Sequence, residues 1–401
     1  YPFWAIYSWI WTVIVPFGNV AWRVEVGQSF AAALGCGMLS MMVSRGSSML
    51  IEGVEELKSL ATRWENAICL VSGVVAGLLL AMDGYMWSES VAINRISVFG
   101  VPWLMAVLLC LMRWMYAPQQ RRYLYLAIFL YGICATIHQS LILGAMGIEV
   151  LILMVSPKLG RDLLAGNCLI YLTCLVLRGS GNIPALSNMT GIQVGLFHLV
   201  GVASLIAAGW LIIKTQKLGT EWKPILIMTA AYLAGLSFYL YMPVSGMTVP
   251  PMQWGYPRTV EGFFHALSRG QYSGMSDSGL LDNPDRFAFQ LWYLVQGLAE
   301  SYGWMLMFIG LLPFLFIVKM HQREKGWIIG VMSVYFCLSV VMVKLMDVTP
   351  DRSSSELCKV FYTASHALFA MMIGYGITIM AAYMATHYQK FRKWGLIGAG
   401  V

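Results

Sequence analysis

The stretch GIQVGLFHLVGVASLIAAGWLII, residues 191–213, decides the fold class of this chain. It contains no Asp, Glu, Lys or Arg. It also exceeds the roughly 20 apolar residues that a helix needs to cross a bilayer. Similar runs recur along the 401 residues, of which 59% are hydrophobic and only 11% are charged. Soluble domains carry about 25% charged residues, so a water-soluble fold is excluded. The sequence predicts an all-α polytopic membrane protein.

We expect about eleven membrane crossings within a single transmembrane domain that spans residues 1–401. The expected crossings are 20–43, 67–83, 96–112, 123–138, 139–156, 162–178, 191–213, 224–243, 302–318, 327–346 and 361–386. The two runs between 123 and 156 could instead form one bent pair or a re-entrant element. Residues 1–17 and 287–301 are expected to be interfacial helices, and 44–66 a solvated connecting helix.

Lys and Arg gather in alternate connections between these runs. Most of the 26 basic residues belong to the set that includes Arg121, Arg122 and the Lys390–Lys393 segment. The positive-inside rule places that set and the C-terminus in the cytoplasm. The loop 244–286 and the carboxylate-rich segments then lie outside. Because the net charge of +7 is dispersed in small groups, we expect membrane lipids and no nucleic acid as partners.

The long loop 244–286 carries the first group of candidate binding residues. Trp254 and Tyr256 offer flat faces that stack on sugar rings or prenyl chains. Arg258 and Arg269 are suited to phosphate, which Arg binds bidentately. His265 shares a face with Arg269 in an expected helix over 259–269. The alternative is that the aromatic residues cap the bundle and the arginines meet lipid headgroups.

A second external segment, 83–95, offers two carboxylates. Asp83 and Glu89 stand where a span ends, and a carboxylate there can act as a general base, a sugar-hydroxyl acceptor or an ion ligand. The alternative is that such a carboxylate merely solvates the helix end or pairs with Arg95. We take both as candidate catalytic residues, with Glu89 first.

Other polar residues have two open interpretations each. Glu356 and Lys359 could bind substrate or form an ordinary helix ion pair. His138, at the outer end of an expected span, could bind substrate or be structural. Glu149 lies inside a span, where carboxylates are often functional. HExxH, CxxC, Walker A and dinucleotide-binding motifs do not occur, so the sequence assigns no metal ligands and no cofactor.

Four stretches resemble a family of multispanning membrane proteins that includes the protein O-mannosyltransferases of the endoplasmic reticulum and many bacterial members. They are MWSESV at 86–91 with the helix that follows to Trp114, RYLYL at 122–126 continuing to His138, PPMQWGYP at 250–257 with RGQY at 269–272, and 360–376. The third is the most specific, and adds Gln271 and Tyr272 to the candidate binding residues.

The resemblance implies a GT-C type bundle and an inverting glycosyltransferase. It implies a polyprenyl-phosphate-linked sugar as donor, a protein or glycan as acceptor, and transfer on the extracytoplasmic face of a bacterial inner membrane or of the endoplasmic reticulum. The family pattern opens with a span and an acidic external loop, and Tyr1-Pro2 resembles the end of that loop. We therefore expect the chain to be N-terminally truncated and to lack the catalytic Asp of the family. Competing classes are a secondary transporter or lipid-carrier flippase, and a non-catalytic scaffold.

Overall fold

The computed structural model describes residues 2–91, 96–181, 186, 189, 191–250, 255–268, 282–347 and 352–388, with the backbone alone for 352–359. In this described part all named elements are helices, and the β-bridges are limited to the isolated pair Val54–Met320. The prediction of an all-α polytopic membrane protein is confirmed.

Eight helical segments of the described residues are long and apolar enough to cross a membrane. They are α2 (Val20–Gly53), α3 (Thr62–Met82), α5 (Ile96–Tyr116), α8 (Pro157–Ser180), α10 (Gly191–Thr215), α11 (Trp222–Leu236) continued through η3 (Ser237–Leu240) and α12 (Tyr241–Met247), α16 (Gln322–Phe336) continued through η6 (Cys337–Val341) and α17 (Met342–Met346), and the Val360–Thr386 part of α18 (Arg352–Thr386).

The remaining three expected crossings are helical but shorter or bent. The runs 123–138 and 139–156 become α6 (Arg122–Ile137) and η2 (Gln139–Gly144) with α7 (Ala145–Val155). At about 1.5 Å per residue, α6 reaches only about 24 Å. The third run forms α15 (Trp304–Leu315), which is bent by 108° from α14 (Pro284–Tyr302). Gly303, at φ 78°, sits at the bend in a conformation that favours glycine.

One of three local expectations is wrong, and the other two segments contain helices. The expected connecting helix over 44–66 is wrong, because α2 runs on to Gly53 and only η1 (Glu55–Leu57) lies before α3. The expected interfacial segment 1–17 contains the helix α1 (Pro2–Ile14). The helix expected over 259–269 is α13 (Val260–Leu267), with Thr259 as its N-cap accepting from the Gly262 N–H.

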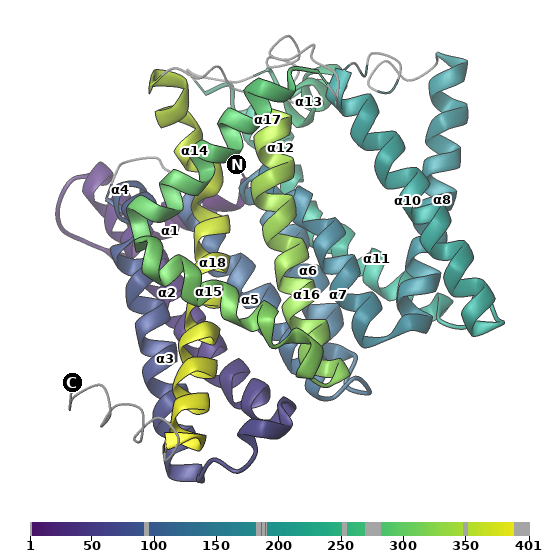
Figure 1. The fold of residues 1–401 in the computed structure, drawn as a ribbon. Coiled ribbons are helices and arrows are strands. Elements are labelled where there is room, and N and C mark those ends of the chain that lie inside the picture. Colours follow the sequence, from purple (N-terminus) through teal and green to yellow (C-terminus); the bar gives the residue numbers. More distant parts are fainter. Residues whose placement is uncertain are drawn as a thin grey trace.

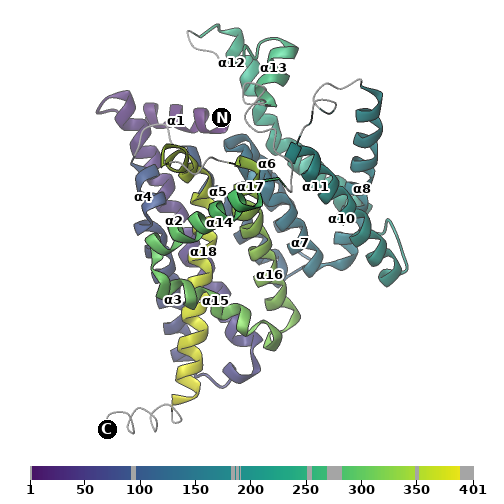
Figure 2. The same cartoon turned by 45° about the horizontal axis from the view of Figure 1, so that its top comes forward.

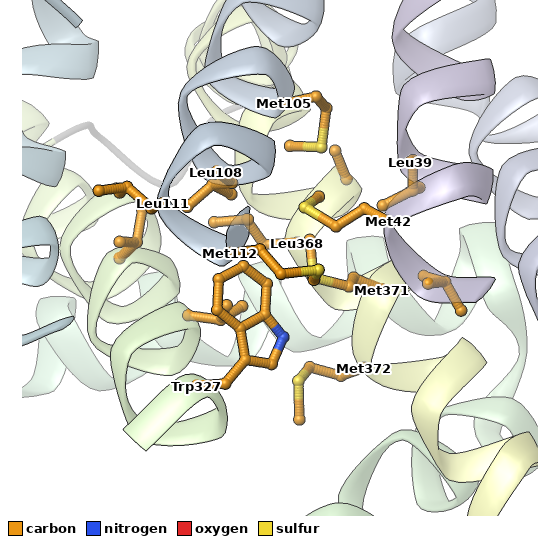
Figure 3. Packing of buried hydrophobic residues seen from close by; sticks show 14 of the residues in the cluster. Leu39, Met42, Met105, Leu108, Leu111, Met112, Trp327, Leu368, Met371 and Met372 are labelled. Carbon is orange, nitrogen blue, oxygen red and sulfur yellow. The ribbon is translucent and has the colours of Figure 1, made fainter. Parts of the chain in front are cut away.

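The core lies where α2, α3, α5, α16 and α18 pack together. Figure 3 shows labelled Leu and Met side chains from α2, α5 and α18 gathered around Trp327 of α16. Trp327 and Tyr375 are both fully buried, and the indole N–H donates to the Tyr375 hydroxyl over 2.9 Å. Each polar tip thereby has a partner in an apolar surrounding, as buried aromatic residues require.

Glycines let some helices approach closely. A Cβ on Gly376 of α18 would lie 1.9 Å from the carbonyl oxygen of Ile309 in α15. Small residues at such contacts are typical of membrane bundles, where van der Waals packing takes over from the hydrophobic effect.

The bundle has two distinct ends. Figures 1 and 2 show α4 (Gly84–Ser90), α13, α14 and α17 toward one end, and the C-terminal end of α18 toward the other. We call the first the α14 end. The hairpin of α8 and α10 stands to one side of the remaining helices in Figure 1. The α14 end gathers most of the described candidate residues.

Candidate functional site at the α14 end

Asp83 links α3 to α4. The residue ends α3 and is also the N-cap of α4, where its carboxylate accepts from the backbone N–H of Tyr85 over 3.4 Å. A carboxylate at a helix N-terminus satisfies an otherwise unpaired N–H and interacts favourably with the helix dipole. The cap therefore orients α4, the short helix that also carries Glu89.

The Asp83 carboxylate also contacts His366 of α18. The His366 Nδ1 lies 3.1 Å from Asp83 Oδ2 and 3.2 Å from Oδ1. Both side chains are buried, with 0% and 1% exposure. Tyr85 lies against the imidazole, with ring centroids 4.1 Å apart. A buried charge needs such a partner to be tolerated.

The electrostatics of Asp83 are set by two opposing effects. Burial by itself raises the pKa of the carboxyl, but His366, through its charge and hydrogen bond, together with Ser301 and the Tyr85 N–H, outweighs burial. The pKa of Asp83 is therefore held below its usual value. The group is an ionised, positioned carboxylate.

Helix α14 closes this region from a third side. The Tyr302 hydroxyl donates to the carbonyl oxygen of His366 over 3.1 Å. Gly297 lies against Tyr85, whose hydroxyl would be 2.5 Å from a Cβ at that position. Tyr85 joins a small apolar cluster with four further buried residues, Leu294, Met342, Val343 and Tyr362. Tyr85 of α4 and Tyr302 of α14 thus both pack against His366, and residues of α14, α17 and α18 cluster with Tyr85.

Glu89 lies at the other end of α4 and is 6% exposed. Its Oε2 accepts from the Ser97 hydroxyl of α5 over 3.2 Å, and its backbone oxygen accepts from the Gln28 amide of α2 over 2.6 Å. The carboxylate is thus held by α5, and the backbone of Glu89 by α2. A carboxylate fixed in this way can act as a general base when an acceptor hydroxyl comes within hydrogen-bond reach of it.

His138 stands at the break between α6 and η2. Its backbone is extended, with φ −145°, and its Nδ1 contacts the Ser140 hydroxyl. The imidazole packs edge-on against Phe361 of α18, with centroids 5.3 Å apart. The neighbouring Gln139 donates to the carbonyl oxygen of Leu267 over 2.7 Å, so the end of α13 is attached to the same region.

The described candidates of the long loop are exposed. Tyr256 is 66% exposed, and Arg258 and His265 are exposed as well. Trp254, Arg269, Gln271 and Tyr272 lie outside the described residues, and Glu356 and Lys359 are described by their backbone only. The structure thus brings Asp83, Glu89 and His138 to one end of the bundle, and places the start of α18 at the same end (Figure 1).

Two polar contacts at this end, a hydrogen bond and an ion pair, were not predicted from the sequence. Lys344 of α17 donates to the carbonyl oxygen of Asp282 over 2.8 Å and is 6% exposed. Arg286 of α14 pairs with Asp347, Nε to Oδ1 3.5 Å. A lysine inside an apolar run is a signal that could have pointed to Lys344. No comparable signal marks Arg286.

Glu149, the residue on which the transport alternative depends, has a partner in the bundle. Its Oε2 accepts from the Asn167 amide of α8 over 2.8 Å. Among the described residues, no group of three His, Cys, Asp or Glu side chains is arranged to hold a metal ion.

The fold and this site define an integral membrane protein with a buried, oriented set of carboxylates at one end of its bundle. Residues 1–160 match the family model of the protein O-mannosyl-transferase TMEM260 N-terminal domain. The match confirms the predicted likeness to the O-mannosyltransferase family over these residues, which include Asp83, Glu89 and His138. The stretches 250–272 and 360–376 lie outside the matched range. No curated protein and no solved structure matches the chain.

Proposed function

We propose that this protein is a membrane glycosyltransferase that moves a sugar from a polyprenyl-phosphate donor to a protein or glycan acceptor on the extracytoplasmic face. The observation that carries the proposal is the match of residues 1–160 to a protein O-mannosyl-transferase domain. The buried carboxylates of α4 lie in that range and support it.

In the proposed reaction an acceptor hydroxyl attacks the anomeric carbon and the polyprenyl phosphate leaves, so that the configuration inverts. Glu89 takes the proton of the hydroxyl, and Ser97 orients its carboxylate. Asp83 and His366 act as positioning residues, because they fix the start of the helix that carries Glu89. Cations at this end, of which Arg258 is the exposed described example, stabilise the departing phosphate.

The test is a transfer assay of the full-length protein in lipid nanodiscs with polyprenyl-phosphate mannose and a Ser/Thr peptide. We expect Glu89→Gln to lower kcat by about 100-fold or more, the usual contribution of a general base. Glu56→Gln is the control, because Glu56 is an exposed residue of η1 that pairs with Lys319 at the opposite end. Equal turnover of Glu89→Gln and the wild type would remove Glu89 from the mechanism.

The runner-up is transport of a lipid carrier, which the intramembrane pair of Glu149 and Asn167 favours. A transporter would show no sugar transfer, and Glu149→Gln would change the flux of labelled polyprenyl phosphate across the bilayer. A transferase would lose activity with Glu89→Gln and retain it with Glu149→Gln.

A further inference from the structure

Helix α13 presents an uncovered apolar face beside the end of a membrane span. The span Trp222–Met247 ends in α12, and Figure 2 shows α12 and α13 standing out from the rest of the bundle. Val260 and Phe264 of α13 are 70% and 60% exposed. Met247 and Val249, at the end of the span, are 69% and 62% exposed.

The helix has three faces at 3.6 residues per turn. Gly262 and Ala266 form a small-residue face. A Cβ on Gly262 would lie only 2.0 Å from the carbonyl oxygen of Tyr256, and Ala266 contacts Gly255. The apolar face is Val260, Phe263, Phe264 and Leu267, and the polar face is Glu261, His265 and Ser268.

The connection before α13 supports this orientation. Gly255 and Tyr256 both have positive φ, 74° and 48°, and a bulky residue adopts that conformation only when its surroundings impose it. The close contact with Gly262 holds the turn, and leaves the Tyr256 ring 66% exposed. At the other end, the Leu267 carbonyl accepts from Gln139 over 2.7 Å. Both ends of α13 are therefore attached to the protein while its apolar face is uncovered.

We propose that α13 lies flat in the surface of the phospholipid leaflet at the α14 end. Val260, Phe263 and Phe264 enter the acyl-chain boundary, and Glu261, His265 and Ser268 face water. We assign the leaflet as the partner of this apolar face because the membrane span before α13 ends at Met247, which places α13 near the bilayer surface. The exposed apolar residues at the end of α12 continue the apolar face of α13, and the exposed cation Arg258 suits phosphate headgroups. The apolar face of α13 takes no part in the proposed sugar transfer, and Arg258 beside it is the one residue that both proposals use.

The test uses the purified full chain in nanodiscs that contain a phospholipid with a diazirine in its acyl chain, followed by peptide mass spectrometry. We expect labels on Val260, Phe263 and Phe264 severalfold above those on Glu261 and His265. Carboxyl footprinting from the water phase should modify Glu261. Phe264→Ser should reduce the lipid labelling of α13, and His265→Ser, a change on the polar face of the same helix, should not.

Two results would overturn the proposal. One is equal labelling of both faces, and the other is modification of the Val260 and Phe264 face by a water-soluble radical probe. Cross-links from that face to a second protein chain in place of lipid would also exclude the leaflet as the occupant. None of these readouts requires sugar transfer, so they separate this proposal from the proposed activity.

Discussion

The Asp83 carboxylate makes two structural contacts: it caps the N-terminus of α4, and it contacts His366 of α18. The sequence marks Asp83 as a polar residue at a span end, which suffices to make it a candidate. Its partner is 283 positions away, and only the packing of α18 against α3 and α4 brings the two together. Glu89 illustrates the same limit, since its contact with Ser97 of α5 was not predicted from the sequence, and Arg95, the partner that the sequence left open, lies outside the described residues.

Asp83 should make the stability of the protein sensitive to acid. Its folded pKa is lowered, so its stabilising effect is present above the unfolded pKa of about 3.9. That effect is lost as pH falls through the folded pKa. We expect the thermal midpoint in nanodiscs to fall as pH is lowered through and below 4, and Asp83→Asn to be less stable at pH 7 and to show a weaker dependence. A variant whose pH profile parallels that of the wild type would contradict this role.

Elements were predicted best where an apolar run was long. The spans α2, α5, α10 and α18 follow from length and composition alone. The short helices α6 and α7 do not, because the break at His138 depends on local contacts such as that with Ser140. The boundary near residue 302 was expected, but the 108° bend at Gly303 was not. Tyr302 before the bend and Gly310 after it both lie against α18.

Helices α15 and α18 can approach closely because Gly376 has no side chain. Gly376→Ala should place a methyl group against the Ile309 carbonyl, where a Cβ would be 1.9 Å away. We expect a loss of about 1–3 kcal/mol, as overpacking usually causes, measured as a lower thermal midpoint. Gly209→Ala in α10 is the matched control, because a Cβ there meets nothing within 4 Å. Equal midpoints for the two variants would argue against the close contact.

At the scale of the whole molecule, the α8–α10 hairpin joins the bundle through a buried polar cluster. Arg161 is fully buried and contacts Asp162, Thr215 and Thr220. Asp162 in turn accepts from the backbone N–H groups of Gly219 and Glu221. The cluster ties the start of α8 to the connection between α10 and α11. Because each member has a partner, its loss would leave buried charge uncompensated.

Arg161→Ala should therefore loosen the hairpin without unfolding the core around Trp327. We expect faster proteolytic cleavage at 216–221, and a destabilisation of about 3–5 kcal/mol, as is typical when one partner of a buried pair is removed. Lys158→Ala, an exposed change in the same turn of α8, is the control. Unchanged cleavage in Arg161→Ala would show that the cluster does not hold the connection.

The sequence by itself determined that this is an all-α membrane protein and which residues are candidates. Long apolar runs are stable only in a bilayer, and a helix satisfies its own backbone there without help from distant residues. The tertiary structure alone decided that Asp83 meets His366, that Glu89 meets Ser97, and that α13 keeps an apolar face uncovered. Those contacts depend on how helices far apart in the chain pack together, and the apolar periodicity of the sequence does not specify that packing.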